Sequence, residues 1–207
     1  AREAAIMAVE VLGEHDTLSI VAYDSGVEVI VPAMQIKDKK DVIQKINRQL
    51  TPQGMTALFS GLSKGIEETT KYLDPNKVNR IILLSDGQAN VGPNSVKALS
   101  ELAKIAAQNG IAVSTFGIGN DYNEDLMTAI ASYSDGNHAY VANVNDLERI
   151  MDKEFRASMS VAAQNFEIII ELEQGAKPIR LLGRDGEIRG NKVVVTMNQV
   201  YADQEKY

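Results

Sequence analysis

Two oxygen-bearing side chains, Asp86 and Thr56, stand where chemistry is expected in this sequence. Asp86 directly follows the apolar run "NRIILLS", which has the composition of a strand buried on both faces. Thr56 lies in "TPQGMTAL", a loop that leads into a helix-like segment. In α/β proteins, ligands bind at the carboxyl ends of parallel strands. A hydroxyl and a carboxylate that meet at that edge would suit a hard cation such as Mg²⁺, which prefers oxygen ligands.

Each of these two residues also has a purely structural interpretation. Thr56 is suited to be the N-cap of the helix that follows it, because a threonine hydroxyl accepts hydrogen bonds from the first free amides of a helix. Asp86 is suited to shape a turn together with Gly87. Spacing alone leaves both interpretations open.

The elements that would position these residues alternate along residues 1–163. The hydrophobic spacing predicts helices over 1–13, 38–50, 57–73, 94–110, 123–134 and 143–163, and strands over 17–24, 27–32, 79–86, 111–119 and 138–142. Asn94 is the expected N-cap of the fourth helix, and Gly110 is expected to end it. Strands separated by helices predict a doubly wound α/β domain with a mostly parallel sheet.

The pattern changes in residues 164–207. In "NFEIIIELEQG", strict alternation puts Phe166, Ile168, Ile170 and Leu172 on one face, and "IRLLG" and "NKVVVTM" follow between Gly, Asp and Asn turns. We therefore expect two domains, 1–163 and 164–207, and the second is the start of an antiparallel β-rich module.

The composition of the chain argues against several classes of partner and site. The net charge is −7 and no block of Lys or Arg stands out, which argues against a nucleic-acid partner. Cysteine is absent, so disulfides and thiolate zinc sites are excluded. No stretch approaches the roughly 20 apolar residues of a membrane span, and membrane attachment stays undetermined. The two histidines have no metal-binding spacing, which argues against zinc.

No coherent catalytic set is visible. A G-x-S-x-G match around Ser63 lies inside a helical pattern, whereas a nucleophile elbow joins a strand to a helix. "GIGNDY" starts like a dinucleotide-binding loop, but Tyr122 replaces its last glycine. We expect a protein that is not an enzyme and has no small-molecule substrate.

Four successive blocks carry a family resemblance: "LSIVAYDSGVEVIVP", "LTPQGMTALFSGL", "NRIILLSDGQANVG" and "GIAVSTFGIGNDYNEDLMTAIA". Together they resemble a von Willebrand factor type A domain. The resemblance implies a Rossmann-like fold with a metal-ion-dependent adhesion site, in which Thr56 represents the second metal loop and Asp86 the third. It further implies that Mg²⁺, or Mn²⁺ or Ca²⁺, is presented to an Asp or Glu carboxylate of a partner protein.

The sequence departs from that family in one respect. The D-x-S-x-S motif of the first metal loop is absent, and residue 1 already lies in the helix that should follow it. We expect the first strand and its ligands upstream of Ala1, so metal binding is conditional on them. Because that strand is central in such sheets, its place should be filled by the upstream strand, by Lys192–Met197 or by a neighbouring molecule.

Two other functions remain open: a Mg²⁺-dependent phosphotransfer or hydrolase domain, and a structural scaffold without metal. A type A domain followed by antiparallel strands is also similar to bacterial proteins of the inter-alpha-trypsin-inhibitor-like kind. That similarity suggests an extracytoplasmic or cell-surface location.

Overall fold

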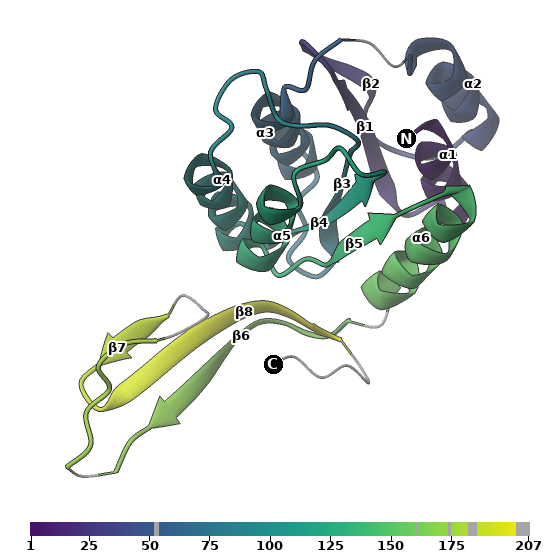
Figure 1. Cartoon of the computed structure of the whole chain (residues 1–207). Coiled ribbons are helices and arrows are strands. Elements are labelled where there is room, and N and C mark those ends of the chain that lie inside the picture. Colours follow the sequence, from purple (N-terminus) through teal and green to yellow (C-terminus); the bar gives the residue numbers. More distant parts are fainter. Residues whose placement is uncertain (52–53, 160, 174, 182–185, 202–207) are drawn as a thin grey trace. The chain divides into compact units, whose positions relative to one another are not determined.

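The computed structural model describes residues 1–51, 54–159, 161–173, 175–181 and 186–201. The chain divides into two compact units, Ala1–Met159 (unit 1) and Ser160–Tyr207 (unit 2). Unit 1 combines helices with strands, and the described part of unit 2 is a small antiparallel sheet (Figure 1).

Unit 1 contains the alternating elements that the hydrophobic pattern predicts. Its helices are α1 (Arg2–Val11), α2 (Lys39–Gln49), α3 (Leu58–Thr70), α4 (Val96–Gln108), α5 (Glu124–Tyr133) and α6 (Val144–Met159). Its strands are β1 (Thr17–Tyr23), β2 (Val27–Gln35), β3 (Asn79–Ser85), β4 (Ile111–Ile118) and β5 (His138–Val141). The α/β fold class is therefore confirmed.

The strands of unit 1 form two sheets. β1 and β2 are an antiparallel hairpin, and β3, β4 and β5 are parallel with β4 in the centre. Among the described residues, no strand pairs with the second edge of β1 or of β3. Lys192–Met197, the alternative occupant considered from the sequence, belongs instead to β8 (Lys192–Tyr201) of unit 2. There it pairs with β6 (Val161–Glu171) and β7 (Glu187–Arg189).

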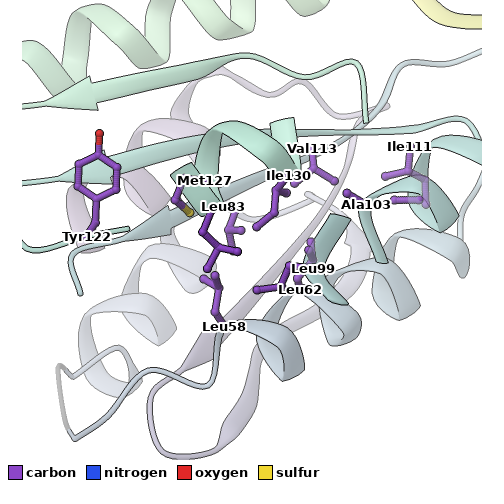
Figure 2. Close-up of a cluster of buried hydrophobic side chains, with 12 residues drawn as sticks. Leu58, Leu62, Leu83, Leu99, Ala103, Ile111, Val113, Tyr122, Met127 and Ile130 are labelled. Atoms are coloured by element: carbon purple, nitrogen blue, oxygen red, sulfur yellow. The ribbon is translucent and has the colours of Figure 1, made fainter. Parts of the chain in front are cut away.

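Helices cover both faces of the parallel sheet because its strands are apolar on both sides. On one face, α3, α4 and α5 bury a cluster against β3 and β4, and Figure 2 shows Leu62, Leu99 and Ile130 converging in it. On the other face, α1 and α6 pack around Phe116, which is 1% exposed. This packing holds the carboxyl ends of β3 and β4 level with each other.

A buried ion pair joins α6 to the sheet. The Arg80 guanidinium donates to the Glu154 carboxylate, and the two side chains are only 6% and 5% exposed. Ser114 and Asn137 also donate hydrogen bonds to Glu154. The carboxylate is thus surrounded by donors, as a buried charge requires.

Some expected helix boundaries were wrong, such as the end of α3 at Thr70 rather than at Leu73. The last helix of unit 1 ends at Met159 rather than at Ala163, because Val161 and Ala163 pair with β8 as the first residues of β6. The N-cap of α4 is Ser95 rather than Asn94, since the Ser95 hydroxyl accepts the hydrogen bond from the Ala98 amide.

Unit 2 is the antiparallel sheet β6-β8-β7, formed by Val161–Glu171, Lys192–Tyr201 and Glu187–Arg189. A small C-terminal antiparallel sheet is therefore confirmed. The expected strand "IRLLG" was wrong where it can be judged: residues 179–181 have no regular structure, and 182 and 183 lie outside the described residues. β7 forms instead because the tight turn at Gly190, with φ +68°, brings Arg189 opposite Lys192.

Candidate metal centre

Asp86 lies just beyond the carboxyl end of β3. Leu83 and Ser85 are buried, the other residues of β3 are partly buried, and the Asp86 side chain is exposed. Ser85 pairs with Gly117 of β4. The Ser85 hydroxyl donates to the Gly87 carbonyl at 3.1 Å and closes the turn around Asp86. The strand therefore brings a carboxylate to the sheet edge where ligands of α/β folds bind.

Thr56 is held against the same edge by backbone hydrogen bonds. Its amide donates to Asn90 Oδ1 at 2.7 Å, and its carbonyl accepts from the amides of Asn90 and Val91 at 3.2 and 3.3 Å. The next amide, that of Ala57, donates to the Asp24 carbonyl at 2.7 Å. Thr56 is thus fixed to the loop that follows Asp86.

The Thr56 hydroxyl faces the residue next to Asp86. A Cβ added to Gly87 would lie 3.2 Å from Thr56 Oγ1, a distance tighter than most real Cβ contacts. Glycine at position 87 therefore allows the two loops to approach. The structure brings the loops of both candidate ligands together, although their role as ligands stays a prediction.

Neither purely structural interpretation is seen in the structure. The N-cap position of α3 belongs to Ala57, and no side chain makes a capping hydrogen bond there. Within the described part of the chain, no hydrogen bond engages the Thr56 hydroxyl or the Asp86 carboxylate. The turn at Gly87 is closed by Ser85 and not by Asp86.

The charge of Asp86 acts on two neighbouring groups. Burial raises the pKa of the Tyr23 phenol, and the negative charge of Asp86 raises it further. The pKa of the Ala1 amino group is lowered by burial, which the charges of Glu3 and Asp86 oppose. Both groups therefore lie within electrostatic range of the carboxylate.

The donor set fits a hard cation in type but supplies only two ligands. A neutral hydroxyl and a carboxylate are oxygen ligands of the kind that Mg²⁺, Mn²⁺ and Ca²⁺ accept. No group of three or more His, Cys, Asp or Glu that could hold a metal ion occurs in the described ranges. A cation held by Thr56 and Asp86 would need water or further protein ligands to complete its coordination.

Two residues that support this edge escaped the sequence interpretation. Asn90 bonds the backbone of Thr56, and the Ser25 hydroxyl accepts from the Met55 amide at 3.2 Å. Gly54, with φ +70°, allows that approach, because a Cβ there would lie 2.5 Å from Ser25 Oγ. Both residues act on backbone groups about thirty positions away, for which sequence spacing has no signal.

The G-x-S-x-G match and the dinucleotide-like loop both lie in places that do not suit their catalytic or cofactor-binding interpretation. Ser63 lies within α3, so it is not at a strand-to-helix elbow. Tyr122 is buried, and its ring covers Gly117, where a Cβ would come within 2.2 Å. The Tyr122 side chain therefore occupies space next to the strand, in a loop that lacks the glycine fingerprint.

No helix among the described residues is long and apolar enough to cross a membrane. The three-layered arrangement of unit 1, with candidate ligands at the carboxyl edge of its strands, defines a Rossmann-like α/β domain. The family model of the von Willebrand factor type A domain matches residues 1–153. The chain belongs to this family.

Individual proteins support that assignment. The uncharacterized protein YfbK of Escherichia coli is 30% identical over 164 residues, which cover 79% of this chain and 28% of YfbK. The von Willebrand factor type A structure from Catenulispora acidiphila has a TM-score of 0.82 at 18% identity and covers 98% of this chain and 50% of its own. Inter-alpha-trypsin inhibitor heavy chains of mammals also match. The chain therefore spans about half, or less, of the length of these relatives.

A second similar structure contains a metal. Proximal thread matrix protein 1 from the mussel byssus, with a zinc-occupied metal-ion-dependent adhesion site, has a TM-score of 0.61 at 19% identity and covers 82% of this chain and 43% of its own. At this identity the likeness shows the shared fold alone. A divalent cation is thus seen at such a site in a structural neighbour.

Proposed function

We propose that this chain is a protein-binding module that presents a divalent cation to an acidic side chain of a partner protein. Thr56 and Asp86 are two of the cation's ligands in this proposal. The proposal is carried by the hydrogen bonds that hold the Thr56 loop against the loop that follows Asp86. Within the described residues, neither the Thr56 hydroxyl nor the Asp86 carboxylate makes a hydrogen bond.

The chemistry needs no catalytic group. A hard cation with an open coordination position attracts a carboxylate, and the protein has only to hold oxygen ligands in place. In a longer protein that carries D-x-S-x-S before Ala1, that loop would supply the remaining ligands.

Isothermal titration of the longer protein with Mg²⁺ and Mn²⁺ tests the proposal. Asp86→Ala should abolish binding of the cation and of the partner while the fold is retained, since the exposed side chain contributes little to the core. Thr56→Val, which keeps the shape and removes the hydroxyl, should weaken binding without abolishing it. Asp121→Ala is the matched control, an exposed acidic residue whose backbone carbonyl, not its carboxylate, accepts from Gln88.

Unchanged metal affinity in Asp86→Ala would remove this residue from the site. Metal binding that releases phosphate from a phosphoester or from ATP would replace the binding module with the phosphotransfer or hydrolase alternative.

A metal-free scaffold is the second candidate, and one observation favours it. Among the described residues, no group of three or more His, Cys, Asp or Glu is placed to hold a metal ion. Under this alternative the longer protein binds its partner equally well in excess EDTA. Loss of partner binding in EDTA, restored by Mg²⁺, supports the cation-presenting module instead.

A further inference from the structure

Asn90 forms hydrogen bonds with both the backbone amide and the backbone carbonyl of Thr56. Its side-chain Oδ1 accepts the Thr56 amide at 2.7 Å, and its own amide donates to the Thr56 carbonyl at 3.2 Å. The residues are 34 positions apart, and neither lies in a helix or strand. One exposed asparagine therefore replaces the backbone ladder that a regular element would provide.

We infer that Asn90 is the positioning residue of the cation site, and this inference rests on the proposed function. Asn90 lies four residues after Asp86 in the same loop, so a bond from Asn90 to Thr56 fixes one candidate ligand relative to the other. Without the bond to Asn90 Oδ1, fewer hydrogen bonds hold Thr56, so part of its ordering has to occur when the cation binds, which costs affinity.

The side chain and the backbone of Asn90 make separable contributions. The amide of residue 90 remains in every variant except proline, so a substitution removes only the bond to Oδ1. Alanine has no acceptor for the Thr56 amide. Aspartate keeps an oxygen at the same position, so it should preserve the bond.

Titration of Mn²⁺ into the longer protein measures the effect. Asn90→Ala should weaken Mn²⁺ affinity by roughly three- to tenfold, the size expected for one lost hydrogen bond. Asn90→Asp should bind at least as tightly as the parent. Asn94→Ala is the matched control, because the Asn94 side-chain Nδ2 donates to the Ala89 carbonyl at 3.3 Å in the same stretch and not to Thr56.

A double-mutant cycle separates positioning from a general structural effect. If Asn90 acts through the Thr56 hydroxyl, Asn90→Ala should have little further effect on Mn²⁺ affinity in a Thr56→Val background. An equal loss in both backgrounds overturns the inference, as does an unchanged affinity in Asn90→Ala alone.

Failure of the proposed function gives a different result. If the parent binds no Mn²⁺, the cation-presenting module is wrong, and the hydrogen bond is then judged by metal-free amide exchange at Thr56 measured by NMR. Faster exchange in Asn90→Ala, with protection restored in Asn90→Asp, shows that Asn90 positions the loop. Equal exchange in parent and Asn90→Ala overturns the positioning role.

Discussion

β4 and β8 occupy the same position in their sheets, yet their surroundings differ. Each is the central strand of three. Residues 111–117 of β4 are all buried, whereas among the described side chains of β8 only Val194 and Met197 are. Helices cover both faces of β4, and the described part of unit 2 contains none.

The register of unit 2 makes one of its faces apolar. Paired residues share a face and neighbours along a strand alternate. One face therefore carries Phe166, Ile168, Ile170, Ile188, Val193, Val195 and Met197. On this face Ile168 and Ile170 are 42% and 51% exposed. The difference teaches that side-chain packing dominates the stability of unit 1, while unit 2 depends more on its backbone ladder.

The buried ion pair should give the largest difference between the units. Glu154→Gln should lower the free energy of unfolding of unit 1 by about 3–5 kcal/mol, because it removes the negative charge from a buried carboxylate that pairs with the buried Arg80. Urea unfolding followed by circular dichroism at 222 nm measures this, since the described helices all lie in unit 1.

Glu171→Gln is the control in unit 2. Its pair with Lys192 is exposed, with side chains 58% and 46% accessible, so the expected cost is about 0–1 kcal/mol. Exchange of the β6 amides reports this value. Equal costs for the two substitutions would contradict the contrast between the units.

Apolar side chains should show the next largest difference. Ile130→Ala should cost about 2–5 kcal/mol, because Ile130 is fully buried among α3, α4 and α5 and truncation leaves a cavity (Figure 2). Ile168→Ala should cost about 1 kcal/mol or less, since much of that side chain already contacts water. Urea unfolding followed by circular dichroism at 222 nm measures the effect of Ile130→Ala, and exchange of the β6 amides measures that of Ile168→Ala. A larger loss for Ile168 would show that the apolar face of unit 2 is covered in solution.

Two glycines sharpen the comparison further. Gly136→Ala should destabilise unit 1 by about 1–3 kcal/mol, because its Cβ would come within 2.0 Å of the Val113 carbonyl oxygen and the backbone must move. Gly190→Ala in unit 2 meets nothing within 4 Å, so only its left-handed φ of +68° costs free energy, about 1 kcal/mol. Thermal unfolding of unit 1 measures the cost of crowding in Gly136→Ala. Exchange of the β7 amides measures the cost of backbone strain in Gly190→Ala.

Local patterns predicted most of unit 1. The continuous apolar run of β3 is typical of a strand covered on both faces, and the helices follow from spacing and end signals such as Gly110, whose φ is +73°. The end of α6 was missed because Val161 leaves the helix to pair with Tyr201, a partner forty positions away. Non-local pairing of this kind has no local signature.

The candidate site was predictable only in part. Asp86 and Thr56 could be singled out because strand ends and loop-to-helix junctions are visible in sequence. Asn90 could not be singled out, because its partners are the backbone amide and carbonyl of Thr56. Every residue other than proline carries both groups, so the sequence does not indicate which of them Asn90 binds.

The smallest expected effect is a pH dependence confined to unit 1, which contains both histidines, His15 and His138. The half-buried His138 ring has Nδ1 3.0 Å from Thr115 Oγ1 and Nε2 3.3 Å from the Tyr122 hydroxyl. Because Thr115 donates its hydroxyl proton to the Met127 carbonyl, Nδ1 is the donor to Thr115 and Nε2 is left to accept from Tyr122.

Burial lowers the pKa of His138, and the charge of Glu124 and a hydrogen bond to the Thr115 backbone only partly oppose this. The unfolded state, with a histidine pKa of about 6.5, therefore binds more protons than the folded state as the pH falls. This contribution to stability is present above that pKa and is lost as the pH falls from 7 towards the lower folded value. Urea midpoints of unit 1 between pH 7.5 and 5.5 should decline in the parent and in the exposed control His15→Gln, and decline less in His138→Gln. Identical slopes in all three proteins would show that His138 does not carry the dependence.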